Sequence, residues 1–419
     1  MSDSTLIDDQ LRGDEPRLDE KGVKRAFRVL FISQMSLGFA QSLIFAVLPP
    51  IARQLGMDEV QTGMIFMVSA VLWIFMNPFW GRQSDKFGRK PIMVFGTLGF
   101  AASILSFGLV VDLGMAGAVA MGSVFPLLMA ARTLNGLIGS GARSASSGYV
   151  ADITPRADRS SGMATTAGAF GIGNMMGPAI AGGLIVISFS APFWFVGGMA
   201  IFSAILILTL LPEKRLSKEE VISRRATRVR PWDRRVWPFM LTATLIGLAQ
   251  TAYMQTVAFY FLDTLHVGPE EATRLVGIGL TALALSALIA QFGIVRRFKL
   301  GPQYLLRAGP VILICAYGLL AWSDSVELRW LAMALIGLGN GILGPGNGAA
   351  VSISVTPDEQ GSALGFVGGM FAVGHVLSPF LIMPLYQWTP EAPYLMGVSL
   401  MVFFFAFVNI HPLVRRVRS

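Results

Sequence analysis

His375 and Arg132 are ionisable side chains inside long apolar segments of this sequence, where a charge is costly and usually serves a function. His375 lies within segment 362–386 and is the only side chain at that depth that titrates near neutral pH. We predict that it binds and releases a proton there; a histidine that only packs helices, at the position matching Asn174, is the alternative. Arg132 has no acidic residue nearby in the sequence. We predict a cation that stabilises anionic groups or tunes a proton site, with a structural arginine bonded to carbonyls as the alternative.

Uncharged hydrogen-bonding side chains recur in two further apolar segments. Gln34 and Gln41 are seven residues apart and therefore share one face of a helix. Gln250, Tyr253 and Gln255 lie together in a later segment. Such groups beside aromatic residues and methionines suit amphiphilic substrates, so we predict that they line a cavity. Hydrogen bonds between helices, without substrate contact, are the alternative.

An island of charge, Gly81–Pro91 with the sequence GRQSDKFGRKP, separates two long apolar stretches. We expect a very short loop between two helices, and a loop this basic lies on the cytoplasmic side of a membrane. Gly81 allows close approach of its helix to another. Asp85 can pair with Arg89 or face the positive N-terminus of a helix. The alternative is that the basic residues only fix the orientation of the chain.

The composition indicates that these residues are carried by membrane-spanning helices. Of 419 residues, 53% are hydrophobic and only 14% are charged, and the mean hydropathy is +0.61. A soluble domain needs more surface charge, whereas about twelve spans of roughly 20 residues fit this composition. The net charge of +8 reflects basic loops rather than nucleic-acid binding. Cys315 is the only cysteine, which excludes an intramolecular disulfide and a cysteine metal cluster.

Twelve apolar segments divide into two sets of six around one basic linker. We predict a disordered cytoplasmic tail at 1–22, an N-terminal six-helix half at 23–212, a basic cytoplasmic linker at 213–235 and a C-terminal half at 236–419. The even-numbered loops hold nearly all Lys and Arg, so both termini are expected in the cytoplasm. The expected segments are 27–51, 60–80, 91–111, 118–149, 162–188, 191–211, 236–262, 273–295, 303–322, 330–354, 362–386 and 392–414.

The two halves repeat each other in sequence. Phe170–Pro178, FGIGNMMGP, recurs as Phe371–Pro379, FAVGHVLSP, and Gly38–Gln41 recurs as Gly247–Gln250. Parallel six-helix repeats place a substrate site near the middle of the membrane, between the halves.

Gly81–Pro91 resembles the loop 2–3 signature of the major facilitator superfamily, G-x-L-a-D-r-x-G-r-k. The resemblance implies an all-α membrane protein with 12 transmembrane helices in two pseudo-symmetric six-helix halves. It also implies a conformational latch, in which this loop contacts the eleventh helix and a carboxylate that ends the fourth; Asp152 stands at that place. The predicted latch residues are Gly81, Asp85, Gly88, Arg89, Lys90 and Asp152.

Two more motifs resemble the twelve-span drug:proton antiporter branch of this family, the tetracycline and multidrug exporters. Leu128-x-x-x-Arg132-x-x-Asn135-Gly136 is similar to motif B, with Asn135 in place of glutamine, and Arg143 follows about 16 Å further along the same helix face. The antiporter signature g-x-x-x-G-P-x-x-G-G is matched at Gly173, Gly177, Pro178 and Gly182. We expect this bent, tightly packed helix to seal the interface between the halves.

The sequence therefore predicts a secondary active transporter that works by alternating access, with proton-coupled efflux of small amphiphilic compounds or drugs. It contains no P-loop, GxSxG or HExxH motif, so we predict no enzyme, no metal and no cofactor beyond a proton gradient. The expected partners are a small-molecule substrate and the lipid bilayer, without nucleic acid, for a monomer in the bacterial inner membrane. The alternative is a uniporter or symporter of an endogenous anionic metabolite, lipid or siderophore.

Overall fold

The computed structural model describes residues 19–154, 159–212, 233–298, 300–356 and 359–415. Most of the predicted tail and linker, at 1–18 and 213–232, lie outside the described residues. The described chain contains helices and no strand. Eleven of its helices are long and apolar enough to cross a membrane. The predicted all-α membrane protein is thus confirmed.

The helices before the linker form the N-terminal half, as we call it below. The fourth span is one helical rod in three parts, because a π-helical turn interrupts it. The elements are α2 (Glu20–Gln54), α3 (Glu59–Phe87), α4 (Arg89–Met115), α5 (Met121–Leu134), η1 (Asn135–Gly139), α6 (Ser140–Ile153), α7 (Arg159–Leu184) and α8 (Ala191–Leu210).

The helices after the linker form the C-terminal half. Two of its spans also contain π-helical turns. The elements are α10 (Trp237–Leu265), α11 (Pro269–Leu288), η3 (Ile289–Val295), α12 (Arg296–Phe298), α13 (Pro302–Trp322), α14 (Val326–Ser354), α15 (Gln360–Met370), α16 (Ala372–Leu377), η4 (Ser378–Ile382), α17 (Met383–Trp388), α18 (Ala392–Ile410) and α19 (Pro412–Arg415).

The helix α7 differs from the eleven candidate spans, although its 26 residues are long enough to cross a bilayer. It is rich in glycine, which lowers its hydropathy, and it packs extensively against α2. Small residues let two helix backbones approach closely, and this packing replaces apolar bulk. We assign α7 as the twelfth rod of the predicted set.

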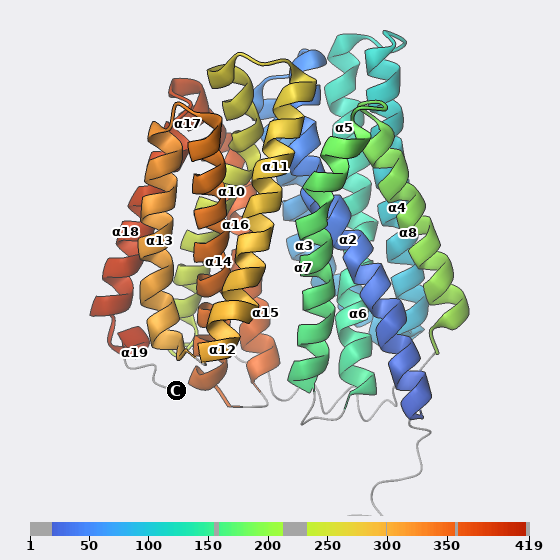
Figure 1. Ribbon diagram of the computed structural model, residues 1–419. Coiled ribbons are helices and arrows are strands. Elements are labelled where there is room, and N and C mark those ends of the chain that lie inside the picture. The colour runs from blue at the N-terminus through green and yellow to red at the C-terminus, as the bar shows by residue number, and fades with distance from the viewer. Residues whose placement is uncertain (1–18, 155–158, 213–232, 299, 357–358, 416–419) are drawn as a thin grey trace, which may run out of the picture.

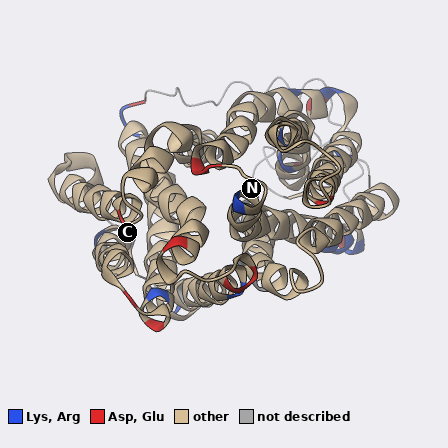
Figure 2. Ribbon diagram, turned by 90° about the horizontal axis from the view of Figure 1, so that it is seen from above, with Lys and Arg blue, Asp and Glu red and all other residues tan. Residues whose placement is uncertain are grey.

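The rods run roughly parallel between two ends of the bundle (Figure 1). We call the end that holds Asp19 and Arg415 the terminal face, and the other end, with the turns around Gly56 and Gly117, the opposite face. Seen along the bundle, most of the ribbon carries neither acidic nor basic residues (Figure 2). An apolar bundle with charge concentrated at the helix ends is the arrangement that a bilayer requires.

The junction of α3 and α4 corrects one expectation. The sequence predicts an eleven-residue loop at Gly81–Pro91, but α3 continues to Phe87 and α4 begins at Arg89. Gly88 alone separates them, with φ at 98°, a conformation that costs other residues free energy. The charged stretch is therefore mostly helical, because polar side chains can extend a helix beyond the hydrocarbon.

The sequence repeat corresponds to repeated packing. A Cβ at Gly38 would lie 2.1 Å from the carbonyl oxygen of Phe170, and a Cβ at Gly247 would lie 2.9 Å from that of Phe371. Glycine at both places allows α2 to contact α7, and α10 to contact the helix pair α15–α16, at backbone distance. Equivalent residues make equivalent contacts in the two halves.

Candidate functional site

Arg89, at the start of α4, is the centre of a buried ionic cluster at the terminal face. Its Nε donates to Asp152 at 2.9 Å, and its Nη2 lies 2.5 Å from Asp85. Its Nη1 donates to the Ser84 hydroxyl at 2.6 Å. The Asp152 side chain is fully buried, and that of Arg89 is 7% exposed. The structure therefore brings together Asp85, Arg89 and Asp152, the charged parts of the predicted latch; Arg89, Asp85, Asp152, Ser84 and Gly81 are called the Arg89 cluster below.

Two glycines make room for this cluster. A Cβ at Gly148 would lie 2.5 Å from the Arg89 guanidinium carbon, and one at Gly81 would lie 3.1 Å from the Ser144 hydroxyl. Gly81 and Gly148 thus let α3 and α6 close around the guanidinium. The predicted latch residue Lys90 is half-buried beside it.

The expected contact between the latch and the eleventh helix lies elsewhere. Among the described residues, the bonds of the Arg89 guanidinium all go to groups of the N-terminal half. The helix α3 does contact the eleventh span, but with its other end: a Cβ at Gly63 would lie 2.9 Å from Met383 and 3.3 Å from Pro379. The halves therefore meet here toward the opposite face.

Arg132 and Asn135 lie at the π-helical turn of the fourth span. Both are buried, and the Asn135 amide donates to Ser69 of α3 at 2.9 Å. The Nε of Arg132 and the Oδ1 of Asn135 have no hydrogen-bond partner among the described residues. Buried polar atoms are usually paired, so two unpaired atoms at this turn make Arg132 and Asn135 candidates for contacts with water or ligand atoms. π-Helical turns are frequent at functional sites.

Arg143 is a second cation of this span. Its guanidinium carbon lies 4.4 Å from the ring centre of Phe170 and 6.0 Å from that of Trp73. Its side chain is exposed. The two rings belong to α7 and α3, the helices that contact α11 and the eleventh span across the half–half boundary. Arg143 therefore faces the space between the halves, whereas Arg132 is buried.

His375 lies in α16, next to the π-helical turn η4 and at the boundary of the halves. Its Nδ1 is 3.2 Å from the Thr251 hydroxyl, and its Nε2 has no partner among the described residues. Its ring centre lies 5.7 Å from that of Phe45 in the other half. One nitrogen is thus oriented by α10, and the other is buried and unpaired, so it is the position at which this imidazole could take up a proton.

The predicted glutamines separate into two kinds. Gln34 donates to Ser146 at 2.7 Å, and Gln255 accepts from Ser378, so each is bonded between helices of its own half. Gln41 and Gln250 are half-buried, and the Gln250 amide lies 3.9 Å from the Met254 sulfur. Tyr253 is buried against Tyr317, with ring centres 6.1 Å apart. The alternative of interhelical bonding therefore describes Gln34 and Gln255, whereas Gln41 and Gln250 stay predicted substrate contacts.

The predicted helix-packing motif of α7 contacts two helices, α2 and α11. A Cβ at Gly173 would lie 1.9 Å from the Met35 carbonyl oxygen, and one at Gly177 would lie 2.1 Å from the Ser42 hydroxyl. Both glycines therefore pack α7 against α2 within one half.

The next turn of α7 does contact the other half. A Cβ at Gly277 of α11 would lie 3.1 Å from the Pro178 carbonyl oxygen, and a Cβ at Gly182 would lie 3.9 Å from the Arg274 Cα. α7 runs through Pro178 without ending, and α7 and α11 lie side by side (Figure 1). Pro178 and Gly182 are thus the members of the motif at the half–half contact.

A second ionic cluster, at the opposite face, was missed in the sequence. Arg53 of α2 lies 2.9 Å from Asp263 of α10 and also pairs with Glu59 of α3. Asp263 accepts from the Tyr386 hydroxyl at 2.7 Å, and Glu59 accepts from Gln387 at 3.0 Å. We call these five residues the Arg53 cluster. Two of its bonds, Arg53–Asp263 and Gln387–Glu59, cross between the halves. The one signal for it in the sequence is an arginine in a loop that otherwise lacks basic residues.

A third ion pair ties the C-terminal half together at the terminal face. Arg235 donates to both oxygens of Glu359 at 3.0 Å and pairs with Asp233 at 2.8 Å. This hydrogen bonding by Arg235, with that of Thr356, lowers the pKa of Glu359 to about 2. The pair links the start of α10 to the start of α15, within one half.

Comparison with known proteins gives consistent relatives. The model of the family described as Major Facilitator Superfamily matches residues 30–379 of this chain. The chain is 23% identical over 384 residues to the quinolone resistance protein NorA of Staphylococcus aureus (strain MSSA476), covering 89% of this chain and 93% of that protein. It is 26% identical over 358 residues to multidrug resistance protein 1 of Bacillus subtilis (strain 168), covering 84% and 86%.

Solved structures share the fold. The human organic anion transporter MFSD10 (TETRAN) matches with a TM-score of 0.66 and 20% identity, over 94% of this chain and 100% of that one. A bacterial homologue of the human lysosomal transporter Spinster, in an inward-facing and occupied conformation, matches with a TM-score of 0.66 and 14% identity, over 96% and 95%. Together with the sequence matches, these likenesses confirm the predicted fold.

Proposed function

Because this chain belongs to the Major Facilitator Superfamily, we propose that it exports small amphiphilic compounds in exchange for protons, by alternating access between its halves. As a member of that family it is a membrane transport protein rather than an enzyme. The names of its bacterial relatives, which concern quinolone and multidrug resistance, support export of drug-like compounds. The observation that carries the proton coupling is His375, with its buried, unpaired Nε2 at the boundary of the halves.

The distribution of charge supports an orientation. Lys21, Lys24, Arg25 and Arg28 lie at the terminal face, and the linker holds the densest basic run of the sequence. Basic loops stay in the cytoplasm, so we assign the terminal face, with both termini, to the cytoplasmic side of a bacterial inner membrane. On this assignment the Arg53 cluster joins the halves on the outer side. We propose that the protein acts as a monomer, since each chain contains both halves.

His375 has no acidic competitor at its depth. Among the described residues, the carboxylates of the long helices lie near helix ends, as Asp112, Asp152 and Asp263 do. Thr251 fixes one nitrogen of the ring, and Phe45 of the other half lies against its face. A proton on the open nitrogen would bring charge to the boundary between the halves. Gaining or losing that charge would change how the halves pack, which is what coupling requires.

The test is transport in proteoliposomes with and without an imposed pH gradient, using a panel of lipophilic cations, neutral drugs and organic anions. We expect the wild-type protein to transport a member of the panel faster with the gradient. His375→Gln should keep substrate binding and lose the gradient dependence. His411→Gln, which removes another histidine at the end of α18, is the matched control. Unchanged gradient-driven transport by His375→Gln would overturn the role of His375.

A second candidate function is transport of organic anions, driven by the gradient of the anion rather than by protons. Arg143 favours it, because an exposed guanidinium between Phe170 and Trp73 presents a cation to the space between the halves. Preference for anions in the same panel, lost in Arg143→Gln or in Arg132→Ala, would select this function. Proton movement on substrate addition to inverted vesicles separates the two candidates.

A further inference from the structure

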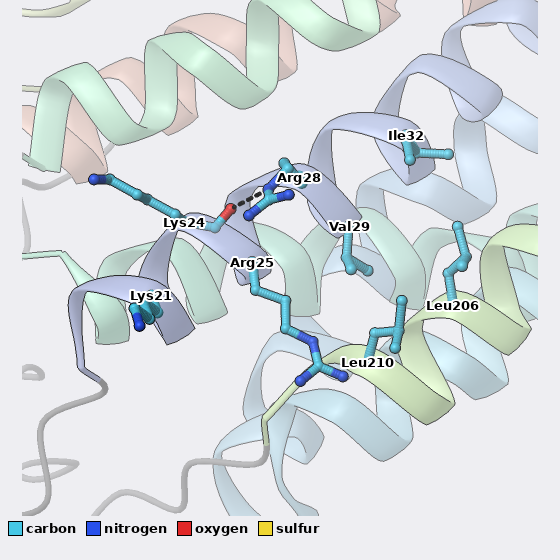
Figure 3. A pocket seen from close by; sticks show the side chains of 8 residues that line it. All are labelled: Lys21, Lys24, Arg25, Arg28, Val29, Ile32, Leu206 and Leu210. Atoms are coloured by element: carbon cyan, nitrogen blue, oxygen red, sulfur yellow. Dashed lines mark hydrogen bonds between the residues drawn. The ribbon is translucent and has the colours of Figure 1, made fainter.

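A cavity of about 500 Å³ lies between α2 and α8 at the terminal face, apart from the ionic clusters and from His375 (Figure 3). Its rim is basic and its floor is aliphatic. The basic residues all come from α2, and the aliphatic residues come from α2 and α8. The lining consists of Lys21, Lys24, Arg25, Arg28, Val29, Ile32, Leu206 and Leu210.

The order of these residues along α2 matches the profile of a membrane surface. Lys21, Arg25, Arg28 and Ile32 are spaced by four, three and four residues, so they lie on one helix face. The charges come first and the apolar side chains follow, about 6 Å deeper from Arg28 to Ile32. In Figure 3, Val29 and Ile32 face Leu206 and Leu210 across the gap between the helices.

The positive charge of the rim is largely uncompensated. Lys24 pairs with Glu20 at the surface, and the Arg28 Nε donates to the Lys24 carbonyl oxygen at 3.4 Å. Lys21 and Arg25 have no acidic partner in the part of the chain that the structure describes. A concave basic surface of this kind attracts an anion.

The cavity belongs to the lipid side of the bundle. Phe202, Ile205 and Leu208 of α8 are 55%, 52% and 58% exposed, so this helix presents bulky apolar side chains outward. Such exposure on a membrane helix marks contact with acyl chains. A ligand in the cavity can therefore have its head among the arginines and its tail in the hydrocarbon.

We propose that this cavity binds an anionic phospholipid of the cytoplasmic leaflet. Its phosphate lies between Arg25 and Arg28, and an acyl chain lies along Ile32, Leu206 and Leu210. Basic pockets between transmembrane helices on this side bind such headgroups. Orientation of the chain alone would explain the charges, but it requires neither a cavity nor an aliphatic floor from a second helix.

The test measures binding of dioleoylphosphatidylglycerol and dioleoylphosphatidylcholine to delipidated full-length protein by native mass spectrometry. We expect the anionic lipid to bind more tightly, and Arg25→Gln/Arg28→Gln to weaken it at least about tenfold without changing the neutral lipid. Arg82→Gln/Arg297→Gln, which removes two exposed cations elsewhere on the terminal face, is the control of equal charge and should change binding less than about twofold.

Two further measurements identify the ligand. Leu210→Trp fills the floor and keeps the charges, so it should also weaken the anionic lipid; full binding by this variant would contradict an acyl chain in the cavity. Soluble glycerol phosphate should fail to displace the lipid, and complete displacement would instead indicate a site for free phosphate. Binding that appears only after deletion of residues 2–18, which contain Asp8, Asp9, Asp14 and Glu15, would assign the cavity to the acidic tail and overturn the proposal.

Discussion

The Arg89 cluster and the Arg53 cluster contain the same kind of ion pair but lie in different parts of the molecule. Each places one arginine between two carboxylates. The Arg89 cluster is buried and lies within one half, whereas the Arg53 cluster is partly exposed and joins the two halves. The first is therefore expected to govern stability, and the second to govern the equilibrium between conformations. Among the residues that the structure describes, the ion pair that joins the halves lies at the opposite face.

The largest effect is expected for Arg89→Gln. It removes the Arg89 cation that pairs with the fully buried Asp152 carboxylate, and breaking such a buried pair costs about 3–5 kcal/mol of unfolding free energy. Thermal unfolding in detergent measures the loss. Arg82→Gln, on an exposed position of α3, should cost less than about 0.5 kcal/mol. Equal stability of the two variants would contradict a stabilising role for the Arg89 cluster.

A smaller loss is expected when the space for Arg89 is reduced. Gly148→Ala places a methyl group 2.5 Å from the guanidinium carbon, so the side chain must shift, at about 1–3 kcal/mol. Gly168→Ala is the control, because its Cβ meets no atom within 4 Å. Chemical denaturation should show Gly148→Ala to be the less stable variant; the reverse order would contradict the tight fit.

Asp263→Asn should affect conformation more than stability. The Arg53 and Asp263 side chains are 41% and 34% exposed, so losing their pair costs less than about 1 kcal/mol. That amount still shifts the ratio of open to closed opposite faces by roughly fivefold.

The readout for Asp263→Asn is alkylation of Met383→Cys, a buried position facing Gly63 of the other half, in a Cys315→Ser background. We expect faster alkylation with Asp263→Asn. Glu271→Gln removes an exposed pair with Arg274 on the same face, within one helix, and should leave the rate unchanged. Equal rates in both variants would show that the Arg53 cluster does not hold the halves together.

These differences explain what the sequence could and could not predict. Arg89 and its two carboxylates follow from a motif, and Arg89 and Asp85 are one helical turn apart. The Arg53 cluster joins residues 210 and 328 positions apart, and only the packing of four helices brings them together. Likewise, the sequence of α7 does not show which neighbouring helix Gly173 and Gly177 contact, because that depends on how the helices pack. The loop predicted at Gly81–Pro91 is reduced to Gly88, because α3 stays helical up to Phe87.

The smallest effect concerns the third ion pair. The pKa of Glu359 is lowered from 4.5 to about 2, so its pairing with Arg235 stabilises the fold above about pH 4.5 and is lost as the pH falls toward 2. Thermal stability of wild type and Glu359→Gln should differ between pH 5 and 7 and converge in acid. If the difference in thermal stability between the two proteins grows on acidification, the pairing of Glu359 with Arg235 does not stabilise the fold as proposed.

We propose that the two halves contact each other at the opposite face in this structure, and that during transport they separate there and come together at the terminal face. Spin-label distances between the halves test it directly, with Met121→Cys and Trp388→Cys at the opposite face and Arg82→Cys and Phe298→Cys at the terminal face; all four positions are exposed. Without substrate, we expect a short distance at the opposite face and a long one at the terminal face. A pH gradient with a transported compound should lengthen the first and shorten the second. Distances that stay fixed at both faces while transport proceeds would contradict alternating access.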